Sequence, residues 1–499
     1  MDYRTVDLMI AGGHVVTVDK GNRVFPDGAV AIKADRIVDV GPTEDLVSRY
    51  VPEKTIDAEG KLIAPGLIDT YHHAGHGLMK GIYRVGRGWP WEELNFHAST
   101  PAWWYADGRL SGVEHIKFGV TTSAVHIGAT PRADIPAPAE QAAKAVDEVG
   151  IRGFVGLGPL DPVLDERTGH LTTPWRGTVC RDGEAFERPI TYEQTIEVTR
   201  DVIERLHNTS DGRVQVMLTT PRLCGENPAY RPVPPYSQDE VDAVREKALE
   251  VRELADEYDV LIHTHGFRGV FEWAEENLGT EALRRILGSD TIFAHMNGLT
   301  DRDIELMAET DAAAVAVPIG HTDIGPCPIA KLLRNGVRVA IATDGAAPFH
   351  QSDLFLDIHR AMVMQQMEHQ DRAVLPPGRA LRLVTAEAAA VFGMDHEIGS
   401  LETGKKADVI LIDLEQPHLT PFVDPANMIA WYVRGNDVDT VLVDGQILME
   451  GRQVLSVDED DVLHHARREA DAAFARFDLK KYLNHGSGYW QGWREDPSG

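Results

Sequence analysis

The hydrophobic pattern of the first 64 residues predicts short β-strands separated by turns. Residues 7–19 (DLMIAGGHVVTVD), 28–41 and 55–64 contain alternating or Val/Ile-rich segments that are broken by Gly or Asp. Such alternation is typical of half-buried strands. Segments 406–414 and 438–451, near the other end of the chain, show the same strand-like pattern. We therefore expect one small β-sandwich built from both chain ends, with two unrelated hairpins as the alternative.

Between these two regions the pattern becomes a repeat of apolar strand, loop and helix. Two of the helices begin with capping-box signatures, Ser237 with Glu240 and Thr300 with Asp303. Strands that alternate with helices predict a parallel sheet, and eight of them predict an α/β fold of the (β/α)₈ barrel type. The strand candidates are residues 67–71, 121–125, 153–157, 214–219, 260–265, 291–295, 313–318 and 337–343.

The domain organisation follows from these patterns. With 499 residues, the chain is long enough for a large domain and a smaller one. We expect the first part of the β-sandwich in residues 1–64, the barrel in 65–388, the second part of the sandwich in 389–455, and a helical and aromatic C-terminal extension in 456–499.

Charge and composition narrow the range of partners. The formal net charge of −29 argues against nucleic acids and anionic membranes as partners. The longest apolar stretch, residues 312–319, is too short to span a bilayer, and the N-terminus lacks a secretory pattern. The three cysteines are scattered and form no CxxC pair. We expect a cytoplasmic protein that acts on a small molecule.

Four polar residues stand where the barrel strands end. His73, His265, His295 and Asp344 each follow an apolar segment, at the first, fifth, sixth and eighth predicted strands. The chemistry of a (β/α)₈ barrel lies at the C-terminal ends of its strands. Imidazoles with one carboxylate suit zinc or a similar divalent ion, and this set leaves room for water. The pattern therefore predicts a catalytic metal site.

Three segments carry a resemblance to a known family. "PGLID" precedes the first histidine motif, residues 332–348 (LLRNGVRVAIATDGAAP) contain the eighth-strand aspartate, and residues 399–413 (GSLETGKKADVILID) lead back into the sandwich. In these segments the chain resembles the amidohydrolase superfamily, in the branch of chlorohydrolases, cytosine and guanine deaminases and N-alkyl aminohydrolases. The resemblance covers nearly the whole chain and implies the barrel-plus-sandwich fold and a homo-oligomeric state.

The resemblance also implies roles for individual residues. The family's first-strand His-X-His motif falls on Tyr71 and His73, and its fifth-strand histidine falls on His265, with His263 as the rival. His295 would contact the substrate or the attacking water. Asp344 would be both a metal ligand and the general base. The fourth-strand end contains no lysine that could bridge two metals, so we expect one divalent ion, zinc first, with iron, cobalt or manganese as alternatives.

The tyrosine at position 71 departs from the family's pattern. Strand alternation puts Tyr71 and His73 on one face and His72 on the other. Three outcomes stay open: Tyr71 coordinates as a phenolate, it stands off while the metal is held by His73, His265 and Asp344, or the metal is weak or lost. Phenylurea and thiocarbamate hydrolases of the superfamily carry asparagine at this position, which favours amide, urea or carbamate cleavage.

Arg268 is the second departure, because ring deaminases of this branch carry glutamate there. A guanidinium cannot act as an acid–base group at neutral pH, but it can bind a carboxylate or a carbonyl. His76, His321 and Trp89 are further substrate-binding candidates, and His321 is also a candidate substitute ligand.

The sequence thus predicts a metal-dependent hydrolase that cleaves the C–N bond of an amide, urea or carbamate. Two alternatives stay open: a heteroaromatic ring deaminase or dechlorinase, and a metal-free barrel with a binding or non-hydrolytic role.

Overall fold

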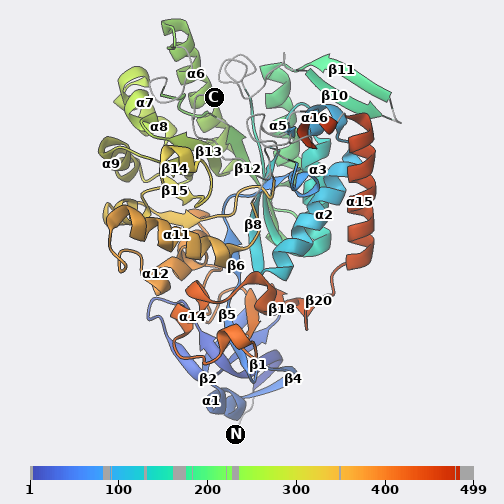
Figure 1. Ribbon diagram of the computed structural model, residues 1–499, viewed down its shortest axis with the longest axis vertical. Coiled ribbons are helices and arrows are strands. Elements are labelled where there is room, and N and C mark those ends of the chain that lie inside the picture. Colours follow the sequence, from blue (N-terminus) through green and yellow to red (C-terminus); the bar gives the residue numbers. More distant parts are fainter. Residues whose placement is uncertain are drawn as a thin grey trace, which may run out of the picture.

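The chain folds into a barrel with a β-sheet domain at its narrow end (Figure 1). The computed structural model describes residues 4–82, 90–91, 93–128, 132–160, 176–181, 184–220, 222–227, 235–347, 350–477 and 479–483.

The narrow-end domain is built from both ends of the chain, as the sequence predicts. Nine strands in the described ranges form one mixed sheet in the order β20-β19-β18-β17-β5-β1-β2-β3, with β4 paired to β1. Leu8 and Val30 from the first part share one apolar core with Val409 and Leu442 from the second. The strands are β1 (Arg4–Val16), β2 (Val24–Lys33), β3 (Arg36–Pro42), β4 (Tyr50–Asp57), β5 (Lys61–Pro65), β17 (Val409–Asp413), β18 (Val438–Val443), β19 (Gln446–Glu450) and β20 (Gln453–Val454).

The barrel sheet is parallel and contains all eight predicted strands. Its order is β16-β15-β14-β13-β12-β9-β8-β6, and β7 continues the first strand beside β8. The Asp344 N–H donates to the Tyr71 carbonyl at 2.9 Å, which links the eighth strand end to the first. The strands are β6 (Leu67–Asp69), β7 (His73–Ala74), β8 (Val120–Ile127), β9 (Arg152–Leu157), β12 (Val214–Thr220), β13 (Ile262–Phe267), β14 (Thr291–Asn297), β15 (Ala313–Ala316) and β16 (Val339–Ile341).

Helices cover the outside of this sheet, and both predicted capping boxes are confirmed at α6 and α9. Helix α15 packs along α2 (Figure 1). A separate hairpin pairs β10 (Arg176–Arg181) with β11 (Glu184–Pro189). The helices are α1 (Thr43–Arg49), α2 (Pro101–Lys117), α3 (Ala137–Val149), α5 (Tyr192–Leu206), α6 (Gln238–Tyr258), α7 (Val270–Leu278), α8 (Thr280–Ile286), α9 (Asp301–Thr310), α10 (Ile329–Arg334), α11 (Leu354–His369), α12 (Pro377–Arg382), α13 (Ala386–Val391), α14 (Pro425–Trp431), α15 (Glu459–Arg476) and α16 (Lys480–Leu483).

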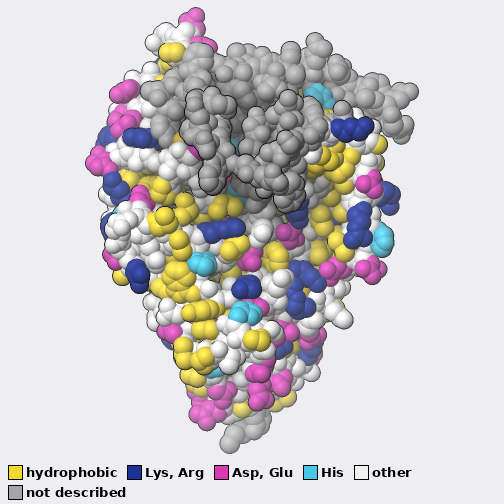
Figure 2. All heavy atoms as spheres, viewed as in Figure 1, with side chains coloured by type: hydrophobic (Ala, Val, Ile, Leu, Met, Phe, Trp, Pro, Cys, Tyr) yellow, Lys and Arg dark blue, Asp and Glu magenta, His cyan; other side chains and the backbone are white. Residues whose placement is uncertain are grey.

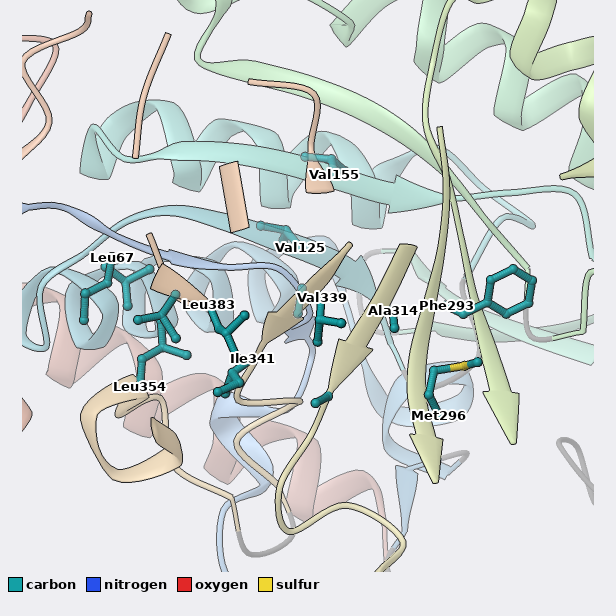
Figure 3. Close-up of a cluster of buried hydrophobic side chains, with 14 of the residues drawn as sticks. Leu67, Val125, Val155, Phe293, Met296, Ala314, Val339, Ile341, Leu354 and Leu383 are labelled. Carbon is teal, nitrogen blue, oxygen red and sulfur yellow. The ribbon is translucent and has the colours of Figure 1, made fainter. Parts of the chain in front are cut away.

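Strand alternation divides the barrel core into two layers. Val125 and Phe293 belong to the cluster between strands and helices, together with Leu354 of α11 (Figure 3). Their chain neighbours, such as Ala124 and Ile292, belong to a second cluster. Side chains of adjacent strand residues point to opposite faces, so this second cluster is the barrel interior. Tyr71 belongs to the interior cluster, which brings its ring beneath the strand ends.

The sandwich contacts the N-terminal ends of the barrel strands. The Gly66 N–H, just before β6, donates to the Asp408 carbonyl at 3.0 Å. Arg152, which begins β9, is buried and pairs with Asp408 and, at 2.6 Å, with Asp444. The C-terminal ends of the strands therefore stay clear of this junction.

The face shown in Figure 2 carries acidic and basic side chains intermixed, with acidic ones gathered at the narrow end. Among the described residues, no helix combines the length and apolar character needed to cross a membrane.

Candidate active site

The four residues from the strand ends meet at one end of the barrel. His73 lies in β7, His265 in β13 and His295 in β14, and Asp344 follows β16. Nε2 of His73 is 3.3 Å from Oδ1 of Asp344, and Nε2 of His295 is 3.9 Å from Oδ2 of the same carboxylate. The Asp344 carboxylate therefore lies beside the imidazoles of His73 and His295, which are far apart in the sequence.

Tyr71 lies at the centre of this group. Its phenol oxygen is 2.8 Å from Nε2 of His73 and 2.6 Å from Nε2 of His265, and the residue is only 1% exposed. Its ring stacks on His263 with 5.3 Å between the centroids, and it meets the rings of His126 and His295 edge-on at 4.9 and 5.2 Å. The predicted shared face of Tyr71 and His73 is thus confirmed.

Hydrogen bonds fix how two of the histidines present their nitrogens. Nδ1 of His73 donates to the Gly128 carbonyl at 2.7 Å, which leaves a lone pair on Nε2 towards Tyr71. Nε2 of His263 donates to the Thr70 carbonyl at 3.1 Å. Between the two rival fifth-strand histidines, it is therefore His265 whose Nε2 faces the phenol.

Burial controls the charge of these groups. It lowers the pKa of His73, although the nearby Asp344 carboxylate opposes the shift, and it lowers the pKa of His295 well below its usual value. The pKa of Tyr71 is well above its usual value because of burial first and the Asp344 charge second, while Arg222 acts in the opposite direction. Burial thus favours the neutral forms of His73 and His295 and the protonated phenol of Tyr71.

The donor set fits a divalent cation in its chemistry. Neutral imidazole nitrogens, a carboxylate and a phenol oxygen suit zinc and its first-row neighbours, and the lone pair of His73 already faces the site. Among the described residues, His73, His265 and Asp344 do not form a group whose potential ligand atoms all lie within 4.8 Å of one another. The phenol oxygen of Tyr71 lies within hydrogen-bond distance of Nε2 of His73 and of His265. A cation bound by both imidazoles would therefore also contact this oxygen.

Another group of ligand-type side chains is more compact. Among the described residues, Asp69, His72 and His115 have potential ligand atoms that all lie within 4.8 Å of one another, and all three are buried. Asp69 and Nδ1 of His72 are engaged in hydrogen bonds, whereas Nε2 of His72 and Nε2 of His115 have no hydrogen-bond partner among the described residues. Thr343 donates its hydroxyl to Asp69 at 2.5 Å, and Nδ1 of His72 donates to the Asp344 carbonyl at 3.0 Å. The prediction that His72 points away from the face of Tyr71 and His73 is confirmed, since its ring meets that of His115 in α2.

A small hollow opens beside His265, where the loop after β12 approaches the end of β13. Arg222 and Glu226 in this hollow form an ion pair, with 2.9 Å between Nε and Oε2, and both side chains are about nine-tenths buried or more. Arg268 lines the same hollow and is exposed. The hollow thus combines one carboxylate with two guanidinium groups.

The other predicted substrate-binding residues differ in exposure. His76 is 2% exposed and its ring stacks on His73 at 4.7 Å, so it packs behind a predicted ligand. His321 is exposed, with its ring 4.6 Å from that of His295. Trp89 lies outside the described residues. His126 and His263 were not assigned to the site from the sequence, although His126 ends its strand as the chosen histidines do.

Comparisons with known proteins show the family of the chain. A family model described as "Amidohydrolase family" matches residues 62–448. A 5-methylthioadenosine/S-adenosylhomocysteine deaminase from Symbiobacterium thermophilum is 31% identical over 93% of this chain and 98% of its own length.

Solved structures also share the fold. An adenosine deaminase from Xanthomonas campestris with bound zinc has a TM-score of 0.76 and 22% identity, covering 95% of this chain and 100% of its own. A mutant atrazine chlorohydrolase from Arthrobacter aurescens, complexed with zinc and atraton, has a TM-score of 0.72 and 21% identity, covering 93% and 100%.

Proposed function

Because the chain belongs to the amidohydrolase family and is a hydrolase acting on carbon–nitrogen bonds, we propose that it cleaves an amide, urea or carbamate bond of a small molecule with water. The observation that carries this proposal is that the Tyr71 phenol contacts His73 and His265, while Asp344 lies beside His73 and His295, at the C-terminal ends of the barrel strands. Active sites of this fold are built there.

One divalent ion, zinc first, is the cofactor that we propose. His73, His265, Asp344 and Tyr71 would hold it, the last as a phenolate. The zinc bound in two proteins of the same fold supports this choice. When bound, such an ion supplies the Lewis acidity that lowers the pKa of water towards about 7 and polarises the substrate carbonyl.

The chain's own residues would move the proton and stabilise charge. Asp344 accepts a proton from the attacking water on one carboxylate oxygen and then delivers it to the leaving nitrogen, which departs as an amine. His295, 3.9 Å from Asp344, donates Nε2–H to the oxygen that becomes negative as the tetrahedral carbon forms. Burial favours the neutral form of His295, which carries a single N–H, and this role requires the tautomer with the hydrogen on Nε2.

Substrate binding would use the exposed residues around these groups. Arg268, in the hollow beside His265, suits a carboxylate or carbonyl of the substrate, since its planar guanidinium donates two parallel hydrogen bonds. His321, next to His295, would contact the substrate from the opposite side. His76 would act indirectly by supporting the His73 ring. Homo-oligomerisation and a cytoplasmic location stay predictions from the sequence.

Ring deamination is the second candidate, and the relatives favour it. The 31% identical relative is a deaminase of 5-methylthioadenosine and S-adenosylhomocysteine. The same water activation would serve this reaction, with ammonia as the leaving group.

A parallel assay tests both. Zinc-loaded protein is incubated with N-acyl amino acids, ureido acids and carbamates, and separately with 5-methylthioadenosine, S-adenosylhomocysteine and adenosine. Amine release from the first set supports the main proposal, and ammonia release from the second alone replaces it with deamination. No turnover in either set, together with no metal uptake, would favour the metal-free alternative and reject both.

A further inference from the structure

A buried polar network lies directly behind the Tyr71–His73 face of the site. It consists of Asp69, His72, His115 and Thr343, none of them more than 2% exposed. The ring of His72 meets that of His115 edge-on at 4.4 Å, and Nε2 of His115 is 3.4 Å from Oδ2 of Asp69. None of the catalytic roles proposed above uses these residues.

Asp344 has an unusual backbone conformation. Its φ is +64°, in the left-handed region that residues other than glycine rarely adopt. Such a conformation is strained and persists only when the surroundings impose it. The side-chain direction of Asp344 therefore depends on whatever holds its two peptide groups.

The first strand holds both peptide groups. The Asp344 N–H donates to the Tyr71 carbonyl at 2.9 Å, and Nδ1 of His72 donates to the Asp344 carbonyl at 3.0 Å. A carbonyl only accepts hydrogen bonds, so Nδ1 of His72 must carry a hydrogen. Residues 71 and 72 thus hold Asp344 from both sides.

The residue before Asp344 is held by the same network. Asp69 accepts from the Thr343 N–H at 3.1 Å and from the Thr343 hydroxyl at 2.5 Å. His115 of helix α2 packs against the same Asp69 carboxylate. The end of the eighth strand is therefore joined to the first strand through the side chains of Asp69 and His72.

We propose that His72 is a positioning residue for Asp344. By holding the Asp344 carbonyl, it keeps the left-handed backbone that aims the carboxylate at His73, 3.3 Å away, and at His295. Asp69 and Thr343 form the second half of this clamp. The inference rests on the proposed role of Asp344 as the general base.

The hydrogen bonds of this network are unevenly distributed. Asp69 and Nδ1 of His72 bond to Thr343 and to the Asp344 carbonyl, whereas Nε2 of His72 and Nε2 of His115 have no hydrogen-bond partner among the described residues. We assign Asp69 and Nδ1 of His72 to positioning, because these are the atoms that bond the end of the eighth strand.

The test compares two substitutions of one side chain. His72→Leu removes the donor, whereas His72→Asn retains an amide N–H close to the place of Nδ1. We expect His72→Leu to lower kcat roughly 10- to 100-fold, the range typical of outer-shell partners in metal sites, with KM and metal content unchanged. His72→Asn should recover most of the lost kcat.

Thr343 provides a second pair in case a buried His72 variant does not fold. Thr343→Val removes the hydroxyl donor to Asp69 at nearly constant volume, and Thr343→Ser keeps it. We expect kcat to fall in the valine variant and to recover in the serine variant.

Three outcomes would overturn the inference. They are unchanged kcat in His72→Leu, equal loss of kcat in the leucine and asparagine variants, and loss of a bound metal ion in His72→Leu. Asp344→Asn, measured in parallel, tests the proposed function separately. Full turnover in Asp344→Asn rejects the base role itself, whereas an inactive Asp344→Asn beside a normal His72→Leu rejects only the positioning role.

Discussion

The phenol oxygen of Tyr71 lies 2.6 Å from Nε2 of His265, which joins the first strand of the barrel to the fifth through one side chain. The same oxygen is 2.8 Å from Nε2 of His73. A tyrosine side chain is longer than a histidine side chain, so its oxygen reaches the space between the two imidazoles. The phenol therefore occupies the space between the imidazoles of His73 and His265.

Two variants of Tyr71 test whether its phenol binds the metal. Tyr71→Phe removes the oxygen and should weaken zinc binding, because one ligand is lost. Tyr71→His supplies an imidazole and should keep or strengthen binding. Zinc dissociation constants measured by competition with a chelator compare the three proteins. Ferric iron adds a second readout, since a bound phenolate gives a visible charge-transfer band that Tyr71→Phe must lack. Equal zinc affinity in Tyr71→Phe and the unmodified protein would mean that the phenol stands off.

His263 and His265 form a matched pair for the fifth-strand ligand. Glutamine places an amide nitrogen near the position of imidazole Nε2 but is a poor ligand for zinc. His265→Gln should weaken zinc binding roughly 100-fold or more, above the 10- to 100-fold typical of outer-shell changes. His263→Gln should bind zinc normally, since its amide can still donate to the Thr70 carbonyl. Isothermal titration with zinc measures both, and the reverse order of affinities would assign the ligand to His263.

Asp344→Asn tests the proton transfer. The amide cannot accept a proton from water, so kcat should fall by roughly 10²–10⁴, the usual contribution of a general base. The melting temperature should change little, because the Asp344 backbone keeps its bonds to Tyr71 and His72. Full activity in this variant would refute the assignment.

Gly345, which follows Asp344 in the chain, has no room for a side chain. A Cβ at this position would overlap Nδ1 of His76, whose buried ring is stacked on His73. Gly345→Ala should therefore displace His76, destabilise the protein by about 1–3 kcal/mol as overpacking does, and lower activity. The control is Gly378→Ala in α12, where the nearest atom is 3.9 Å away and alanine favours the helix. Urea denaturation and kcat distinguish the pair, and equal behaviour of the two variants would contradict the packing argument.

Asp107 should make stability depend on pH between about 4 and 6. Its carboxylate accepts from the Gly75 and Leu78 N–H groups at 2.5 and 2.9 Å, and burial raises its pKa to about 6. A carboxyl whose folded pKa is raised contributes stability that is present below the unfolded value and is lost as pH rises through the folded value. A shift of about two units corresponds to roughly 3 kcal/mol.

The check for Asp107 is a difference measurement. The free energy of unfolding is measured from pH 4 to pH 7 for the unmodified protein and for Asp107→Asn, which cannot ionise at this position. Relative to Asp107→Asn, the unmodified protein should lose free energy of unfolding as the pH rises to about 6. Above this pH, the difference between the two proteins should become constant. Parallel curves across the whole range would show that Asp107 does not titrate in this window.

The repeating elements could be predicted from the sequence because their signals are local. Each barrel strand is a short apolar segment. The helices that follow Ser237 and Thr300 can be recognised from their capping residues, which lie within four positions of one another. The order of His73, His265, His295 and Asp344 at strand ends follows from the same segments, since a parallel barrel aligns all its C-terminal strand ends.

The contacts inside the site depend on distances between strands that are far apart in the sequence. Alternation predicted that Tyr71 and His73 share a face, yet it could not tell that the phenol oxygen contacts both His73 and His265. Likewise, it could not separate His263 from His265, because residues two apart on a strand point the same way. The relative placement of the strands and the reach of each side chain decided these contacts.

The sequence by itself therefore determined the barrel, the sandwich from both chain ends and the ring of histidines, through hydrophobic periods and caps that act over a few residues. Only the tertiary structure decided that His72 reaches the Asp344 carbonyl, that Arg222 pairs with Glu226 beside His265, and that His126 packs on Tyr71. These contacts join residues on different strands and loops, and close packing of the whole barrel brings them within hydrogen-bond or ring-contact distance.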